Sequence, residues 1–227
     1  MYLNIKAGEI WGLNKIIGQL LILSYIQTRP SYIFENPITI FYRSYSDMER
    51  KIYNPIQKDQ VIFLKTHADT NGEYTLVEVE LADGGGVGLH YHKTYSEKFD
   101  CLEGEVQIQL GKTIHRLQPG QSATAHQNTN HLFRNRSGNS CKFLVELRPA
   151  SRGFEQSLQI GYGLANDGLT RSNGFPKDKL ALAWLFDISE SNLPGWMSIF
   201  EFILRKQAKK ARAKGVDKQL TEKYVRF

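Results

Sequence analysis

Residues 84–104 read GGGVGLHYHKTYSEKFDCLEG, and this stretch decides the fold and the site. His90 and His92 are two positions apart, so in an extended strand both imidazoles lie on the same side. The rise of a strand separates them by about 6–7 Å along the chain. Glu97 follows after a short turn and leads into a second, apolar strand. Two histidines and a carboxylate on adjacent strands form a candidate metal site.

A fourth candidate ligand, His131, opens the strand-like run HLFRN at residues 131–135. Three neutral imidazoles and one carboxylate suit a borderline divalent ion such as Fe, Mn, Ni, Co, Cu or Zn. The residues therefore predict one bound divalent metal ion, held by His90, His92, Glu97 and His131. They do not select the metal.

The surrounding sequence alternates with the period of β-strands. Val77, Val79 and Leu81 are separated by Glu78 and Glu80, which is typical of a half-buried strand. The same alternation occurs at residues 106–110 and 143–147, with turn residues such as Asn-Gly and Pro-Gly between the strands. Short strands about ten residues apart predict an all-β antiparallel sandwich or barrel from about residue 60 to residue 150.

Two stretches of the chain resemble the two motifs of the cupin family. The first motif is matched at every fixed position: Gly84, His90, His92, Glu97 and Gly104. The second is matched at Gly120, His131 and Asn135, whereas His126 and Asn128 replace its proline and middle glycine, so the loop before His131 is expected to depart from the family path. The resemblance covers about residues 60–150. It implies a single cupin jelly-roll β-barrel with a metal in its interior, bound by His90, His92, Glu97 and His131.

The resemblance also implies a function that the ligands alone do not define. Four protein ligands leave open positions on an ion that prefers five or six, as a catalytic metal requires. We expect a metal-dependent, dioxygenase-like oxidoreductase in which Glu97 also acts as a catalytic acid–base group. An apolar pocket would suit an apolar, aromatic or enolisable substrate; it is expected to be lined by Phe99, Val106, Ile108, Leu110 and Phe133. The alternative is a non-catalytic cupin that binds or senses a small molecule.

Other histidines and the cysteines have weaker claims to function. His126 is expected near the mouth of the barrel, where its functional roles would be a hydrogen-bond donor to a metal ligand or a proton shuttle; the alternative is a solvated residue. His67 and His115 are expected to face solvent. Cys101 shares strand parity with Glu97, and both Cys101 and Cys141 are expected to be buried free thiols, which suits a reducing compartment.

Sequence on either side of the barrel suggests three parts: an N-terminal extension at 1–47, the barrel at 48–150 and a helical extension at 151–227. A second interpretation of the first part is that Met48 is the native start. Residues 153–167 and 178–188 are expected to be short helices, and a longer helix is expected to run from Trp196 to Lys214 and to end at Gly215. Its apolar stripe is expected to contact the core: Ile199, Phe200, Ile203 and Leu204.

The 227 residues carry a net charge of +6, and the charge is localised. Residues 201–227 hold nine Lys and Arg against three Asp and Glu, which accounts for all of it. No nucleic-acid-reading motif accompanies this basic tail, so we do not expect nucleic acid as a partner. The apolar run at 16–26 is too short to span a bilayer, which needs roughly 20 residues. We expect a cytoplasmic homodimer without membrane contact, which acts on or binds a small molecule.

Overall fold

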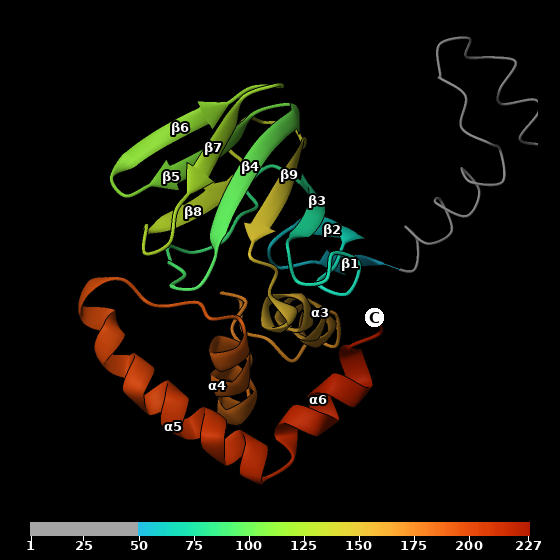
Figure 1. Ribbon diagram of the computed structural model, residues 1–227, viewed down its shortest axis with the longest axis vertical. Coiled ribbons are helices and arrows are strands. Elements are labelled where there is room, and N and C mark those ends of the chain that lie inside the picture. Colours follow the sequence, from blue (N-terminus) through green and yellow to red (C-terminus); the bar gives the residue numbers. More distant parts are fainter. Residues whose placement is uncertain (1–49) are drawn as a thin grey trace, which may run out of the picture. The chain divides into compact units, whose positions relative to one another are not determined.

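The computed structural model describes residues 50–227, apart from the side chains of Trp196 and Met197. The expectations for residues 1–47 lie outside this range. Within it, the first half is made of strands, in chain order: β1 (Lys51–Asn54), β2 (Asp59–Lys65), β3 (Thr75–Leu81), β4 (Ser96–Glu103), β5 (Val106–Leu110), β6 (Thr113–Leu117), β7 (Ser122–Ala125), β8 (His131–Arg134) and β9 (Cys141–Arg148). They form a six-stranded sheet in the order β1-β2-β3-β9-β4-β7 and a three-stranded sheet in the order β6-β5-β8 (Figure 1).

Alternating burial explains why the strands pair as they do. Along β3 every second residue is buried, and Val77 lies opposite Val145 of the neighbouring β9. The other sheet contributes Val106 and Ile108 to the same apolar core. All ladders between these strands are antiparallel. The predicted all-β barrel is confirmed.

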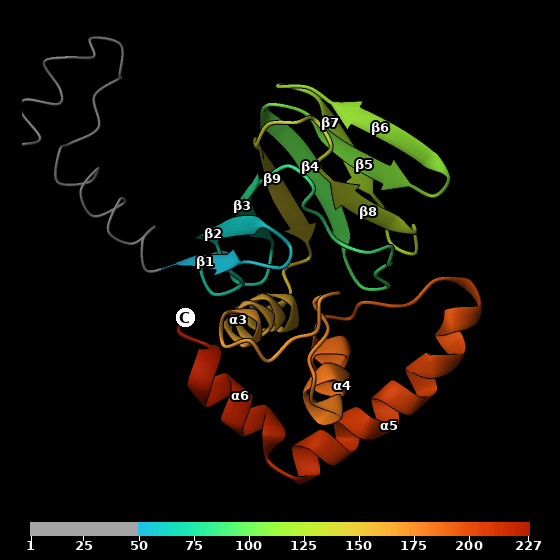
Figure 2. The same ribbon diagram turned by 180° about the vertical axis from the view of Figure 1, so that it is seen from behind.

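Helices follow the barrel: α3 (Arg152–Asn166), α4 (Lys179–Ile188), the short 3-10 helix η1 (Gly195–Ser198), α5 (Ile199–Ala213) and α6 (Val216–Tyr224). Ser151 caps α3 and Asp178 caps α4, because each side chain accepts backbone N–H groups of the first turn. The helices predicted at 153–167 and 178–188 are therefore confirmed. α3 lies against β1 and β2 (Figure 2). Its Phe154, Leu158 and Tyr162 join the barrel core.

The expected core contact of the apolar stripe on α5 is wrong. Ile199 is 72% exposed, Ile203 is 52% exposed and Phe200 is also exposed. The buried side chains of α5 are instead Glu201, Ala208 and Ala211. The small alanines permit close approach to α4. Ile199, Phe200 and Ile203 are turned outward, and Leu204, the fourth residue of the stripe, is half-buried. After Gly215, which has a φ of +71°, the chain begins α6, an element that the sequence analysis did not predict.

None of the helices described by the structure is both long and apolar enough to cross a membrane.

Candidate metal centre

The four candidate ligands come from one loop and two strands at one end of the barrel. His90 and His92 lie in the loop before β4, where isolated bridges replace the regular strand that their spacing suggested. His90 pairs with His131, the first residue of β8, through backbone hydrogen bonds of 3.0 and 2.7 Å. Glu97 points inward from β4, because it lies on the buried face of that strand. Backbone pairing and strand parity thus bring distant residues to one point.

Two special backbone positions hold the loops around the cluster. Gly86 has a φ of +150°, and a Cβ atom there would lie 2.5 Å from the carbonyl oxygen of Phe133, so the loop can lie against β8 only with glycine. Asn128 has a φ of +62°, a conformation that glycine and asparagine tolerate best. The backbone N–H of Asn128 donates to the carbonyl oxygen of His92 at 2.7 Å. Asn128 therefore serves where the second motif has its glycine.

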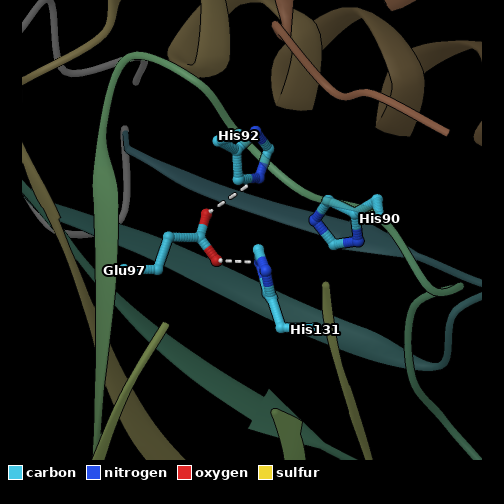
Figure 3. Close-up of side chains that lie close together, drawn as sticks. All are labelled: His90, His92, Glu97 and His131. Carbon is cyan, nitrogen blue, oxygen red and sulfur yellow. Dashed lines mark hydrogen bonds and ion pairs between the residues drawn. The ribbon is translucent and has the colours of Figure 1, made fainter. Parts of the chain in front are cut away.

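The ligand atoms converge closely (Figure 3). One ligand atom from each of His90, His92, Glu97 and His131 lies within 4.8 Å of all the others. Nε2 of His131 is 3.1 Å from Oε2 of Glu97, and Nε2 of His92 is 3.6 Å from Oε1 of Glu97. His90 is half-buried, whereas the other three side chains are buried.

Backbone carbonyl groups orient all three imidazoles in the same way. Nδ1 of His90 lies 2.8 Å from the carbonyl oxygen of Gly88, and Nδ1 of His131 lies 2.8 Å from that of Thr129. Nδ1 of His92 lies 3.3 Å from the carbonyl oxygen of Glu190. Since a carbonyl can only accept, each Nδ1 carries a proton. Every Nε2 is then left to face the cluster, as in sites where an outer partner fixes the histidine tautomer.

Burial and the charges within the cluster shift the pKa values of Glu97 and the three histidines in different directions. Burial alone would raise the pKa of Glu97, but the hydrogen bond from His131 and the nearby imidazoles outweigh it and lower the pKa to about 2. Burial lowers the pKa of His90 to about 4 and also lowers that of His92. Burial opposes protonation of His131 as well, yet the hydrogen bond to Glu97 raises its pKa. A metal ion at this point would bind the three imidazoles in their neutral form together with the ionised carboxylate.

This donor set fits a divalent metal ion. Metal–ligand bonds of about 2.0–2.2 Å place adjacent donors roughly 3 Å apart and opposite donors roughly 4 Å apart. The measured separations of 3.1 and 3.6 Å, with all atoms inside 4.8 Å, are within a small side-chain adjustment of those values. The nitrogen and oxygen donors match borderline ions better than Ca²⁺, which takes oxygen ligands only.

The residues expected to line an apolar pocket all lie inside the barrel, although not equally deep. Phe99, Val106 and Ile108 are fully buried in the core, whereas Leu110 and Phe133 are partly buried against it. The Phe99 ring lies 6.3 Å from the His131 ring, so apolar side chains form the inner boundary of the cluster. A hollow of about 550 Å³ lies elsewhere, lined by Asp187 and side chains of α5.

The remaining histidines and the cysteines take no part in the cluster. His126 and His115 are exposed, while His67 is half-buried and accepts a hydrogen bond from Arg152 at 3.1 Å. Cys101 and Cys141 are buried free thiols, as predicted, and burial raises the pKa of both.

Sequence reasoning missed Tyr95. Its ring stacks on His92 at 4.3 Å, and its hydroxyl lies 3.5 Å from Nε2 of His92. Burial, then the charges of Glu97 and Glu190, raise its pKa well above the usual value, so the hydroxyl stays protonated. Tyr95 shares strand parity with Glu97, and that parity was the available signal.

The chain thus contains a small antiparallel β-barrel that carries a candidate metal centre at one end. Residues 77–145 match the family model of the cupin domain, and the chain therefore contains a cupin domain with a helical extension. No curated protein matches the chain.

Several solved structures are similar to part of the chain. An RmlC-like cupin from Shewanella frigidimarina is 19% identical, with a TM-score of 0.41, over 47% of this chain and 90% of that one. TT1209 from Thermus thermophilus is 28% identical, with a TM-score of 0.38, over 43% and 88%. KdgF from a Halomonas species is 17% identical, with a TM-score of 0.37, over 40% and 81%.

Proposed function

We propose that the chain binds one divalent metal ion through His90, His92, Glu97 and His131 and uses it as the centre of a metal-dependent enzyme. The observation that carries this proposal is the common orientation of the three imidazoles, each with Nδ1 at a backbone carbonyl, in a group whose four ligand atoms converge within 4.8 Å of one another. Such an ion would supply Lewis acidity toward a substrate oxygen and, if redox-active, the ability to use dioxygen. The reaction we favour is a dioxygenase-like oxidation of a small apolar, aromatic or enolisable molecule.

The chain's own residues supply positioning and proton transfer. Glu97 is a buried carboxylate whose pKa is lowered by the neighbouring imidazoles, so it is ionised at neutral pH and can act as an anionic ligand. We propose that it also takes up a proton from the substrate during the reaction. The Phe99 ring lies beside His131 and packs near the partly buried Phe133, so the barrel side of the cluster is apolar, which favours an apolar ligand over water. Tyr95 holds the His92 ring by stacking.

Metal retention tests the site. Protein incubated separately with Fe, Mn, Ni, Co, Cu and Zn, then desalted, is expected to keep close to one equivalent of at least one metal. The His90→Ala/His92→Ala variant removes two ligands and is expected to lose it. His115→Ala/His126→Ala removes two exposed histidines of the same barrel and is the matched control. Equal retention in all three proteins would refute the site.

Substitution of Glu97 separates an enzyme from a binding module. Glu97→Gln keeps an oxygen ligand but not the base, so we expect much of the metal to remain and turnover to fall by about 100-fold or more. The substrate is first found by oxygen-uptake screening against flavonols, diketones and catechols. Glu80→Gln, at an exposed position of β3, is the control.

Two outcomes argue against this account. A Glu97→Gln variant with full metal and undiminished turnover excludes the acid–base role. A wild-type protein that binds metal but turns over nothing in a broad screen favours the non-catalytic binding or sensing cupin.

A further inference from the structure

The chain segment that follows α4 passes across the end of the barrel that carries the candidate ligands (Figure 1). Asn192 pairs with Tyr91, the residue between His90 and His92, as in an antiparallel bridge. The amide of Tyr91 donates to the carbonyl of Asn192 at 3.2 Å, and the amide of Asn192 donates back at 2.9 Å. The ligand loop is thereby tied to a segment about 100 residues later in the chain.

His92 depends on this segment in a way that the other two histidines do not. His90 and His131 are oriented by carbonyl groups two residues away, within their own loops. His92 has its Nδ1 at the carbonyl of Glu190, which is 98 residues distant in sequence. Tyr95, whose ring stacks on His92, is held by the same segment, because its hydroxyl donates to the carbonyl of Ser189 at 2.9 Å.

Asn192 fixes the carbonyl that His92 uses. Its buried side-chain amide donates to the carbonyl of Glu190 at 2.8 Å and to that of Tyr91 at 3.2 Å. Glu190 itself has a φ of +53°, so the chain turns sharply at the residue whose carbonyl faces His92.

The segment is in turn anchored to α5. The amide of Leu193 donates to the carboxylate of Glu201 at 2.9 Å, and that carboxylate lies 3.9 Å from Lys93 of the ligand loop. Arg205 donates to the side-chain oxygen of Asn192 at 3.4 Å. The helical extension therefore contacts the ligand loop at two places. Asn192 pairs with Tyr91, and Glu201 of α5 lies close to Lys93.

We propose that residues 189–192 position His92 for metal binding, so that the helical extension sets the affinity of a metal centre whose ligands all lie in the barrel. This inference rests on the proposed metal site. Glu190 acts through its carbonyl and Asn192 through its side-chain amide; both are positioning residues.

The test compares Asn192→Ala with a matched control, Asn166→Ala, in the full chain. Asn166 also lies in the helical extension, and its amide also donates to two carbonyls, those of Tyr53 and Tyr162, at 2.7 and 2.9 Å. We expect Asn192→Ala to weaken Zn²⁺ binding by about 10-fold or more, the range seen when outer partners of metal-binding histidines are removed. Asn166→Ala is expected to leave Zn²⁺ affinity unchanged.

A second variant and a second readout guard against a general loss of structure. Tyr95→Phe keeps the ring stacked on His92 and removes the hydroxyl, which bonds to Ser189 at 2.9 Å and lies 3.5 Å from Nε2 of His92, so a smaller loss of Zn²⁺ affinity is expected. With Co²⁺ as the probe, the visible ligand-field absorption of Asn192→Ala is expected to differ from that of the wild type, because one imidazole has lost its fixed orientation. Asn166→Ala is expected to give the wild-type spectrum.

The outcomes distinguish the two claims. If the wild type binds Zn²⁺ tightly and both Asn192→Ala and Tyr95→Phe match it in affinity and in the Co²⁺ spectrum, the positioning role is wrong and the metal site stands. If the wild type retains neither ion, the proposed function fails, and the inference fails with it.

Discussion

Asp59, the first residue of β2, is a carboxylate buried against α3. Its Oδ2 accepts a hydrogen bond from Tyr162 at 2.7 Å, and its Oδ1 has no hydrogen-bond partner in the part of the chain that the structure describes. Burial raises its pKa from 3.8 to about 6, although the hydrogen bonds act in the opposite direction. A carboxyl group that is harder to ionise in the folded state than in the unfolded state makes folding depend on pH.

The sign of that dependence is unusual for a carboxyl group. The stabilising contribution of protonated Asp59 is complete below about pH 4 and is lost as pH rises through about 6. Asp59→Asn removes the ionisable group. The free energy of unfolding of the variant, relative to that of the wild type, is therefore expected to rise by up to roughly 3 kcal/mol between about pH 4 and pH 7. Urea unfolding of both proteins across this range measures the difference. A difference that is constant with pH would contradict the prediction.

Among the strands and helices, an element could be predicted from the sequence when one of its faces is apolar and the other is polar. β3 could be predicted because its apolar and acidic residues alternate, whereas β6 exposes four of its five residues and has no alternation to detect. The four candidate ligands were predictable because their spacing is local to short motifs. The contact of His92 with Glu190 was not, because nothing in a linear pattern relates residues 98 positions apart. The outward apolar side of α5 was missed because helical spacing identifies a stripe without saying which partner covers it.

α3 and α6 approach so closely that glycine is required between them. A Cβ atom at Gly163 would lie 2.2 Å from the Tyr224 ring, so Gly163→Ala must displace that ring. Overpacking of this kind costs about 1–3 kcal/mol, against a gain in helix propensity of about 1 kcal/mol. We expect a net loss in free energy of unfolding and faster tryptic cleavage at Lys218 and Lys223.

Gly161 of the same helix is the matched control for this contact. A Cβ atom there would have its nearest neighbour at 3.9 Å, an ordinary contact, so Gly161→Ala is expected to be neutral or stabilising by up to about 1 kcal/mol. Equal effects of the two substitutions on stability would show that α6 does not pack on α3 as described.

For the molecule as a whole, the outer side of α5 is the feature that bears on assembly. Ile199 and Ile203 are more than half exposed, and Phe202 is 76% exposed. Adjacent exposed apolar side chains of this size are frequent at protein–protein contacts. The homodimer expected from the sequence can be tested through this surface, with the sheet edges β1 and β7 as the other possible contact.

Phe202→Glu replaces the most exposed apolar side chain of α5 with a charged one and is expected to shift a dimer toward the monomer, because a charged group is costly to bury in an apolar contact. Phe175→Glu, at a loop aromatic that is 51% exposed, is the control and should leave assembly unchanged. Light scattering at micromolar concentration measures the mass. A wild type at 26.0 kDa would exclude the homodimer, and a dimer that survives Phe202→Glu would place its contact elsewhere.

The bridge between Tyr91 and Asn192 also orders events in time. Contacts between residues far apart in sequence form late, because closing a long loop is entropically unfavourable until other structure holds its ends together. The strands up to β9 can pair before the segment at 189–192 arrives, and His90 and His131 are then already oriented by their own loops. We therefore expect His92 to be the last of the three to be fixed. A nascent or refolding chain would then pass through a state with a formed barrel and an incomplete set of candidate ligands, and an ion at the proposed site would bind after the helices dock rather than guide the barrel to fold.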